Sequence, residues 1–96
     1  MTSKQRATLR SMASQIEPIF QIGKASLTDN QIDAINDALE KRELIKITVL
    51  RSSDMDASEV MEELCDALGA TQVCTIGNKV VIYRRSKNDK IKHIEF

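Results

Sequence analysis

The chain has 96 residues, of which 42% are hydrophobic and 29% charged, and its 14 basic residues balance its 14 acidic ones. This length predicts one domain, residues 1–96, with a single core. No apolar stretch approaches the roughly 18 residues of a membrane-spanning helix, and the zero net charge argues against a uniformly basic nucleic-acid binder. Because the first residues contain no apolar signal segment, we expect a cytoplasmic protein with reduced cysteines.

The charges are unevenly distributed along the chain. Residues 29–66 contain eleven acids and four bases, whereas the remaining residues contain ten bases and three acids. This asymmetry predicts a molecule with an acidic side and a basic side. The alternative is that the helices display solvated charge that evens out in three dimensions.

The first predicted element is an amphipathic helix that Thr2 or Ser3 caps and Pro18 ends, because the residue before a proline is disfavoured in the α region. Its apolar face has helical spacing and consists of Leu9, Met12, Ala13 and Ile16. Arg6 and Arg10 are four residues apart, so they lie on one flank of this helix and can face a partner.

A strand, a helix and a second strand are predicted next. Residues 18–22, PIFQI, are mostly apolar, begin with Pro18 and are followed by Gly23, which indicates a short strand. Thr28 and Gln31 have the spacing of a capping box before a second helix. Residues 44–50 alternate, with isoleucine and valine on one side and Lys46 on the other, which indicates a strand. Such a unit favours a parallel pair of strands.

A third helix and a β-hairpin complete the predicted order. Asp56 and Glu59 form another capping box, and Gly69 is a natural stop. Gly77 and Asn78 join two β-rich runs in a two-residue turn that needs positive φ angles. The order helix, strand, helix, strand, helix, strand, strand predicts a two-layer α/β (α+β) fold with three helices and a mixed four-stranded sheet.

The loop after the first predicted strand is a candidate phosphate site. It consists of Gly23, Lys24, Ala25 and Ser26, with Thr28 at the start of the following helix. Unpaired N–H groups at a helix N-terminus attract anions, small residues let a phosphodiester backbone come close, and Lys24 adds a positive charge. A tight turn with an exposed lysine explains the same residues, so both readings stay open.

The C-terminal part of the chain is rich in bases. Six bases and one acid lie between Gly77 and Lys92, a density that suits a phosphate backbone. The predicted contact residues of this region and of the remaining basic surface are Lys79, Tyr83, Arg84, Arg85, Lys4 and Lys46. Residues 86–96 are polar, and we expect a loosely ordered tail. With three aromatic residues the chain cannot bind RNA by stacking bases on a sheet, so contacts would fall on phosphate, sugar and shape.

Metal and catalytic sites find little support. His93 is the only histidine, and Cys65 and Cys74 do not form a CxxC pair. We therefore expect no enzyme, metal, cofactor or small-molecule substrate, and a monomer, because no long apolar stripe is left over. A second interpretation is a protein-interaction adaptor whose acidic third helix, residues 54–66, docks on a basic partner.

Four stretches in order resemble the CRM (chloroplast RNA splicing and ribosome maturation) domain, and most closely its free-standing bacterial YhbY-like members. They are KQRATLRSMA, EPIFQIGK leading to LT, ALEKRELIKI and TIGNKVVIYR, between Lys4 and about Arg85. The resemblance implies a fold similar to the C-terminal domain of bacterial translation initiation factor three. It also implies binding to ribosomal RNA in precursors of the large ribosomal subunit, and a role in ribosome maturation. The family's G-x-x-G loop falls on residues 23–26, where Ser26 replaces the usual second glycine.

Overall fold

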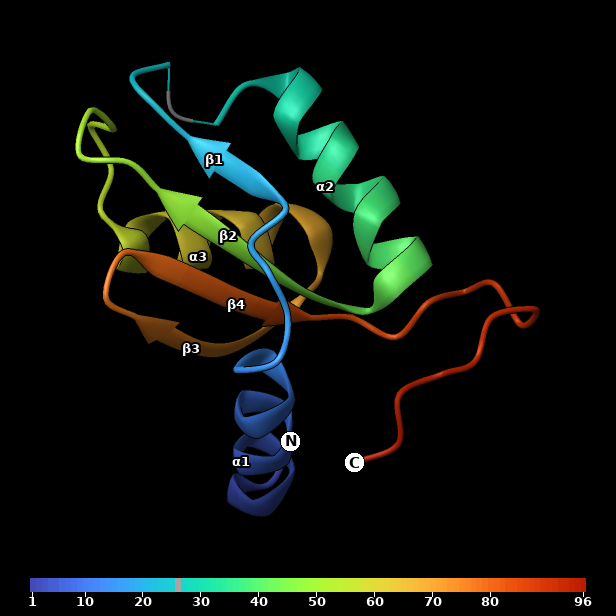
Figure 1. The fold of residues 1–96 in the computed structure, drawn as a ribbon. Helices are drawn as coiled ribbons and strands as arrows, with labels where there is room; N and C mark the ends of the chain where they lie inside the picture. Colours follow the sequence, from blue (N-terminus) through green and yellow to red (C-terminus); the bar gives the residue numbers. More distant parts are fainter. Residues whose placement is uncertain (26) are drawn as a thin grey trace.

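The computed structural model describes residues 1–25 and 27–96, in which three helices surround a four-stranded sheet (Figure 1). The elements are α1 (Ser3–Ala13), β1 (Phe20–Ile22), α2 (Asp29–Arg42), β2 (Leu44–Val49), α3 (Ala57–Leu68), β3 (Thr71–Ile76) and β4 (Lys79–Tyr83). The strand order is β1-β2-β4-β3, with β1 and β2 parallel and the other pairs antiparallel. The predicted element order, the mixed sheet and the parallel pair are therefore confirmed.

Local sequence signals set the helix ends. Thr28 Oγ1 accepts a hydrogen bond from Gln31 N at 3.2 Å, and Gln31 Oε1 accepts one from Thr28 N at 3.2 Å, so the predicted capping box of α2 is present. The Asp56–Glu59 box starts α3 in the same way. Gly69 ends α3 in the left-handed region at φ 64°, a conformation that glycine adopts without steric cost.

The first helix ends earlier than the sequence predicts. α1 stops at Ala13, and the next residues form tighter turns in which Gln15 N donates to Met12 O at 3.1 Å and Ile16 N to Ala13 O at 3.3 Å. The Ser14 hydroxyl donates to Ser11 O at 2.6 Å, which competes with continued helix. The chain has thus left the helical path before it reaches the proline.

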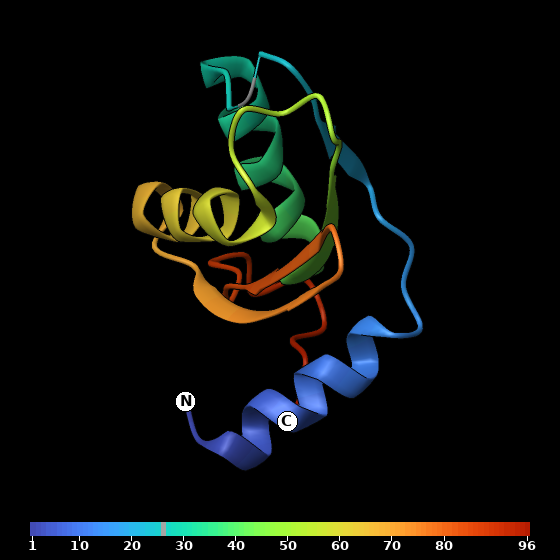
Figure 2. The same cartoon turned by 90° about the vertical axis from the view of Figure 1, so that its left-hand side faces the viewer.

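The sheet is packed on both faces. On one face, α2 and α3 contribute Ile35, Leu39, Val60 and Leu64 to a core with the alternate residues of β2 and β4. On the other face, Leu9 and Ala13 of α1 pack against Leu44, Val73, Val81 and Tyr83. Figure 2 shows α1 on the side of the sheet opposite α2 and α3. The two predicted layers are present, and α1 with the C-terminal tail adds a partial third layer.

The hairpin turn differs from the prediction in one torsion. Gly77 has a φ of 60°, whereas Asn78 is outside the positive region. Positive φ at the first central residue alone is typical of a type II′ turn, which matches the twist of the flanking strands. Asn78 instead fastens the turn to the end of β2, because its amide Nδ2 donates to Val49 O at 3.2 Å and its carbonyl accepts from Val49 N at 2.7 Å.

The C-terminal tail is held in place, contrary to the prediction of a loosely ordered segment. Residues 86–96 form no helix or strand, but Glu43, which is 1% exposed, binds them through its carboxylate. It accepts hydrogen bonds from Ser86 N at 2.7 Å and from Ile94 N at 2.7 Å, and it contacts His93 Nδ1 at 2.6 Å. A polar tail can be ordered when a buried acceptor satisfies its main-chain donors.

Candidate nucleic-acid interface

The predicted phosphate loop leaves β1 at the edge of the sheet where β2 also ends. Lys24 and Ala25 are exposed, and Ser26 lies outside the described residues. Thr28 is occupied by the capping box, and Asp29 adds a negative charge in the first turn of α2. Both features reduce the attraction of this helix start for an anion. Lys24 is therefore the part of the loop that is best suited to contact phosphate.

Gly23 is not required by the backbone conformation. Its φ lies outside the left-handed region, in contrast to Gly69 and Gly77. A Cβ placed on it would lie 3.8 Å from Leu50 Cδ1 and 3.8 Å from Ser52 Oγ, which are ordinary contact distances. These neighbours belong to the loop after β2, so the β1 and β2 loops, with Lys24 and Arg51, lie at the same edge of the sheet.

Two bases point from the sheet to the side of α1. Ile45, Ile47 and Val49 of β2 pack toward α2 and α3, so the alternation directs Lys46 to the opposite face. In β4, Val81 and Tyr83 pack against α1, so Lys79 belongs to the same face. Lys46 pairs with Val81 and Thr48 with Lys79, which makes the two lysines diagonal neighbours, about 7–8 Å apart.

α1 adds two further bases to this side of the molecule. Arg6 and Arg10 are exposed and, together with Val73 of β3, line a hollow of about 400 Å³. We call Arg6, Arg10, Lys46 and Lys79 the basic face. Lys4 is exposed on the same helix, and α1 contains no acidic residue.

The half-buried Cys74 lies within the influence of two positive charges of the basic face. Burial raises the pKa of its thiol, whereas the positive charges of Arg10 and Lys46 oppose that rise. Cys74 pairs with Val81 across the sheet, in the same row as Lys46. Arg10 and Lys46 therefore act on one point of the sheet from two different elements, and an anion at this point would be attracted to both.

The hydrogen bonds of the two lysines differ. The Lys46 ammonium donates to Ile16 O at 3.3 Å and is half-buried, so its charge is fixed where the segment after α1 passes the sheet. Among the described residues, the Lys79 ammonium donates one long bond of 3.4 Å, to the side-chain oxygen of its neighbour Asn78. Lys79 is thus better able to move its ammonium group to a ligand.

Arg84 is a structural residue, contrary to the prediction that it contacts RNA. Its guanidinium donates to Asn36 Oδ1 at 2.9 Å and to Leu68 O at 2.8 Å. It also forms an ion pair with Glu40 at 3.1 Å, and its side chain is 18% exposed. These bonds join the segment directly after β4 to the middle of α2 and to the end of α3, so the guanidinium is already used inside the protein.

Tyr83 is also unsuited to the predicted contact. It is 8% exposed and packs edge-on against Phe96, with ring centroids 4.9 Å apart. Burial raises the pKa of its hydroxyl, and the charge of Glu43 adds to this rise. Arg85 remains exposed beside it, so among the residues that close β4 it is the one available to a partner.

The alternation of β1 and β2 places further residues at the basic face that sequence reasoning did not assign to the site. Gln21 pairs with Thr48, Thr48 with Lys79, and Lys79 with Ile76. Gln21 is exposed and Ile76 is 42% exposed. The period-two pattern of the strands could have predicted which residues share a face of the sheet with Lys46 and Lys79. Which of these residues stay uncovered, however, depends on where α1 packs.

The acids lie on the other side of the sheet. α3 displays Glu59, Glu62, Glu63 and Asp66, with Ala67 and Met55 in a shallow hollow of about 590 Å³. Met55 packs in part against the core and is therefore only partly available to a partner. The predicted division into an acidic and a basic side is thus present in three dimensions.

The part of the chain that the structure describes offers no group of three metal-ligating side chains. Within the same residues, no helix is long and apolar enough to cross a bilayer. Both cysteines are free thiols. Burial, together with the negative charge of Asp66, raises the pKa of Cys65 to about 11, which makes this thiol unreactive.

Comparison with known proteins agrees with this architecture. The family model of the CRS1 / YhbY (CRM) domain matches residues 1–84. The chain is 46% identical over 90 residues to the probable RNA-binding protein YqeI of Bacillus subtilis, covering 94% of each chain. It is 30% identical over 92 residues to an RNA-binding protein of Haemophilus influenzae, covering 96% of this chain and 93% of the other.

A solved structure is similar as well. The solution structure of the hypothetical protein SAV1595 from Staphylococcus aureus superposes with a TM-score of 0.78 at 48% sequence identity, covering 94% of both chains. Three helices on a mixed four-stranded sheet with one basic face thus define a small α/β domain. The chain belongs to the CRM domain family, as the sequence motifs predicted.

Proposed function

We propose that this chain is a non-catalytic RNA-binding protein that holds the RNA phosphate backbone on its basic face. One observation supports this above all: bases from α1, β2 and β4 gather on one side of the sheet, while the acids of α3 lie on the other. The relatives named as RNA-binding proteins support the same ligand. Lys24 and Arg51 would extend the contact along the sheet edge.

The separation of charge explains how a chain with zero net charge can bind a polyanion. The positive charges neutralise phosphates of the RNA, and the release of the cations condensed on those phosphates drives binding. The acids on the opposite side repel RNA and so favour one orientation of the bound protein. Affinity should then depend on where the bases lie rather than on their total number.

Fluorescence anisotropy with a labelled single-stranded RNA tests this proposal. We expect affinity to fall steeply between about 50 and 200 mM salt, with a logarithmic slope that decreases by about 0.7 for each lost phosphate contact. Arg10→Gln and Lys79→Gln should each reduce the slope. Lys41→Gln removes the same charge from the exposed side of α2 and serves as the matched control. If the control weakens binding as much as the basic-face variants, the proposal is wrong.

The finer form of the proposal, from the family resemblance, is contact with ribosomal RNA in precursors of the large ribosomal subunit and assistance in its maturation. The basic face is suited to such a ligand because its contacts are to backbone and shape rather than to particular bases. Sedimentation of a cell extract through sucrose gradients tests it. Comigration with large-subunit precursors that Lys79→Gln and high salt abolish would support the proposal, and protein that stays at the top would contradict it.

The second candidate function is a protein adaptor that docks through α3. The acidic residues of α3 near Met55 favour this function, because they line a hollow and face away from the basic face. The two functions are compatible in one particle. Glu62→Gln with Glu63→Gln should abolish docking on a basic partner while it leaves RNA affinity unchanged; loss of RNA affinity in this variant would argue against separate faces.

A further inference from the structure

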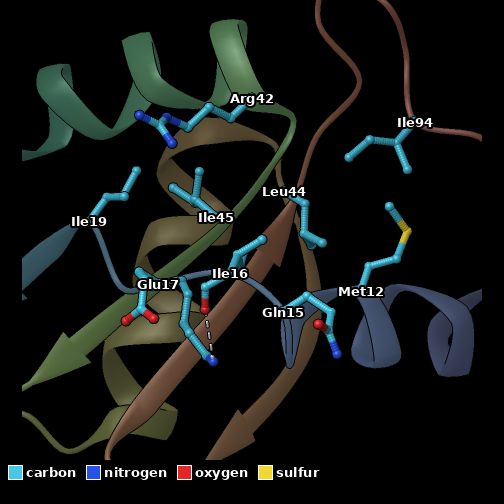
Figure 3. A pocket seen from close by; sticks show the side chains of 10 residues that line it. Met12, Gln15, Ile16, Glu17, Ile19, Arg42, Leu44, Ile45 and Ile94 are labelled. Carbon is cyan, nitrogen blue, oxygen red and sulfur yellow. Dashed lines mark hydrogen bonds between the residues drawn. The ribbon is translucent and has the colours of Figure 1, made fainter.

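A groove of about 760 Å³ opens beside the basic face, on the side of the sheet that α1 covers (Figure 3). Its walls are mostly apolar and are formed by Met12, Ile16, Ile19, Leu44 and Ile94. A volume of this size and a lining of this kind are typical of small-molecule and side-chain binding sites. Neither the family match nor the predicted phosphate contacts account for it.

The groove follows from the unequal lengths of two strands. β1 pairs only with Ile47–Val49, so the first residues of β2, Leu44–Lys46, extend beyond it. The segment between α1 and β1 bends past this end of the sheet and leaves a space against Leu44 and Ile45. The far wall is Ile94, which is fixed because its N–H donates to the buried Glu43 carboxylate at 2.7 Å.

The rim of the groove is polar and carries more positive than negative charge. Arg42 comes from the end of α2, Lys46 from β2 and Gln15 from the turn after α1, and Glu17 is the acid among the lining residues. Figure 3 shows Arg42 and Gln15 on opposite sides of the opening. The Lys46 ammonium donates a hydrogen bond to the Ile16 carbonyl. Apolar walls below a rim of hydrogen-bond donors suit a flat ligand with polar edges and an attached anion.

We propose that this groove receives one unpaired nucleobase of an RNA strand, a proposal that rests on the proposed function of the basic face. Lys46 belongs both to the basic face and to the groove rim, so a strand held on the face runs directly past the opening. The base would lie between Met12, Ile16 and Ile19, and its phosphate would face Lys46 or Arg42. A single-stranded or looped segment would be bound in preference to a continuous duplex, whose bases are stacked and paired.

The aromatic residues of the described chain favour the groove as the place for a base. Tyr83 is 8% exposed, and Phe20 and Phe96 pack against the two cores. Phe20 and Phe96 are only partly buried, but no aromatic side chain of the described residues is fully exposed. The sheet therefore offers no fully exposed ring on which a base can stack, which is the usual way for a sheet to bind single strands. The apolar groove is where a base can leave solvent next to the basic face.

Methyl and amide NMR on the full chain, labelled with 15N and at the methyl groups of isoleucine, leucine and methionine, tests the proposal. The probes are a short oligouridine and an abasic ribose-phosphate strand of the same length, which has the same phosphates but no bases. We expect the oligouridine to produce ring-current shifts at Met12, Ile16 and Ile19, and the abasic strand to shift only the amides of the basic face.

The outcomes separate the two proposals. If both strands shift the basic face and neither moves the groove methyls, or both move them equally, the groove proposal is overturned while the proposed function stands. If neither strand binds, the proposed function fails and the groove proposal fails with it. If an acidic amphipathic peptide moves the groove methyls and oligouridine does not, the groove is a protein site instead.

A variant pair adds an affinity measurement. Met12→Gln should weaken oligouridine binding about fivefold or more and leave the abasic strand unaffected. Met61→Gln makes the same change at a partly buried methionine of α3, outside the groove and the basic face, and is expected to preserve the difference between the two strands. If the two variants show the same ratio of affinities for oligouridine and the abasic strand, the proposal is overturned. The methyl shifts of the unaltered protein test the proposal even if Met12→Gln does not fold.

Discussion

Replacing Glu43 with glutamine is expected to lower the free energy of unfolding by about 2–3 kcal/mol. The carboxylate is 1% exposed and binds Ser86 N, Ile94 N and His93 Nδ1 at 2.7, 2.7 and 2.6 Å. Glutamine has nearly the same shape, but it offers one acceptor oxygen and a donor NH2 group. At least one buried main-chain N–H would then face another donor.

The magnitude follows from the bonds that change. A buried donor without an acceptor costs about 1–3 kcal/mol, and hydrogen bonds to a charged acceptor are roughly twice as strong as neutral ones. For a domain of this size each kcal/mol lowers the melting temperature by about 4–8 °C. We therefore expect Glu43→Gln to melt at least about 8 °C below the unaltered protein near neutral pH.

The effect should also depend on pH. Burial alone would raise the pKa of Glu43, but the hydrogen bonds from His93, Ile94 N and Ser86 N outweigh it and hold the pKa below its usual value of 4.5. The unfolded chain therefore takes up the proton first as the pH falls. The stability that Glu43 contributes is present above about pH 4.5 and is lost as the pH falls through its folded pKa.

Thermal and urea unfolding at neutral and acidic pH measure both effects. Glu95→Gln, an exposed acid of the same tail, is the matched control and should change stability by less than about 0.5 kcal/mol. Equal stability of Glu43→Gln and the unaltered protein near neutral pH would refute this account of the tail. A difference in their free energies of unfolding that increases in acid would also refute it.

Three further predictions concern single positions. Arg84→Met should lower the free energy of unfolding by about 2–4 kcal/mol, because it leaves buried acceptors unpaired. At temperatures where both proteins are folded, it should change RNA affinity less than twofold. A large loss of RNA affinity with normal stability would instead support the predicted RNA contact of Arg84. Gly77→Ala should destabilise by about 1–2 kcal/mol because of its positive φ, whereas Gly23→Ala should be nearly neutral, and equal unfolding curves would contradict this. Ellman's reagent should label Cys65 far more slowly than Cys74 in the folded protein. The reason is that a pKa of about 11 leaves about one Cys65 thiol in 1,000 ionised at mildly basic pH. Similar labelling rates of the two thiols in the folded protein would be inconsistent with the burial of Cys65.

Much of the fold could be predicted because its signals are local. The capping boxes at Thr28 and Asp56 need only residues three positions away. The alternation around Lys46 needs only the pleat of a strand. The family motifs gave the same order of elements independently. Helix ends were less predictable, as the early end of α1 at Ala13 shows, since a serine hydroxyl competed with the helix before the proline could act.

The candidate site could be predicted only in part, because it depends on contacts between distant segments. Arg84 and Arg85 look equivalent in sequence, but in the structure the Arg84 guanidinium donates to Asn36 in the middle of α2 and to Leu68 at the end of α3, whereas Arg85 is exposed. Glu43 looks like a surface acid, yet residues 43 to 51 positions further along the chain bury it. The position of Arg10 close enough to Cys74 to act on its thiol together with Lys46 depends on the packing of α1, which no local pattern specifies.

The central claim is that RNA lies on the basic face, and amide NMR during titration with a single-stranded RNA tests it most directly. We expect the largest shifts at Arg10, Lys46, Thr48 and Lys79, with Lys24 at the adjoining edge, and none along α3. Shifts concentrated on Glu59 to Asp66, with an unaffected basic face, would contradict the account.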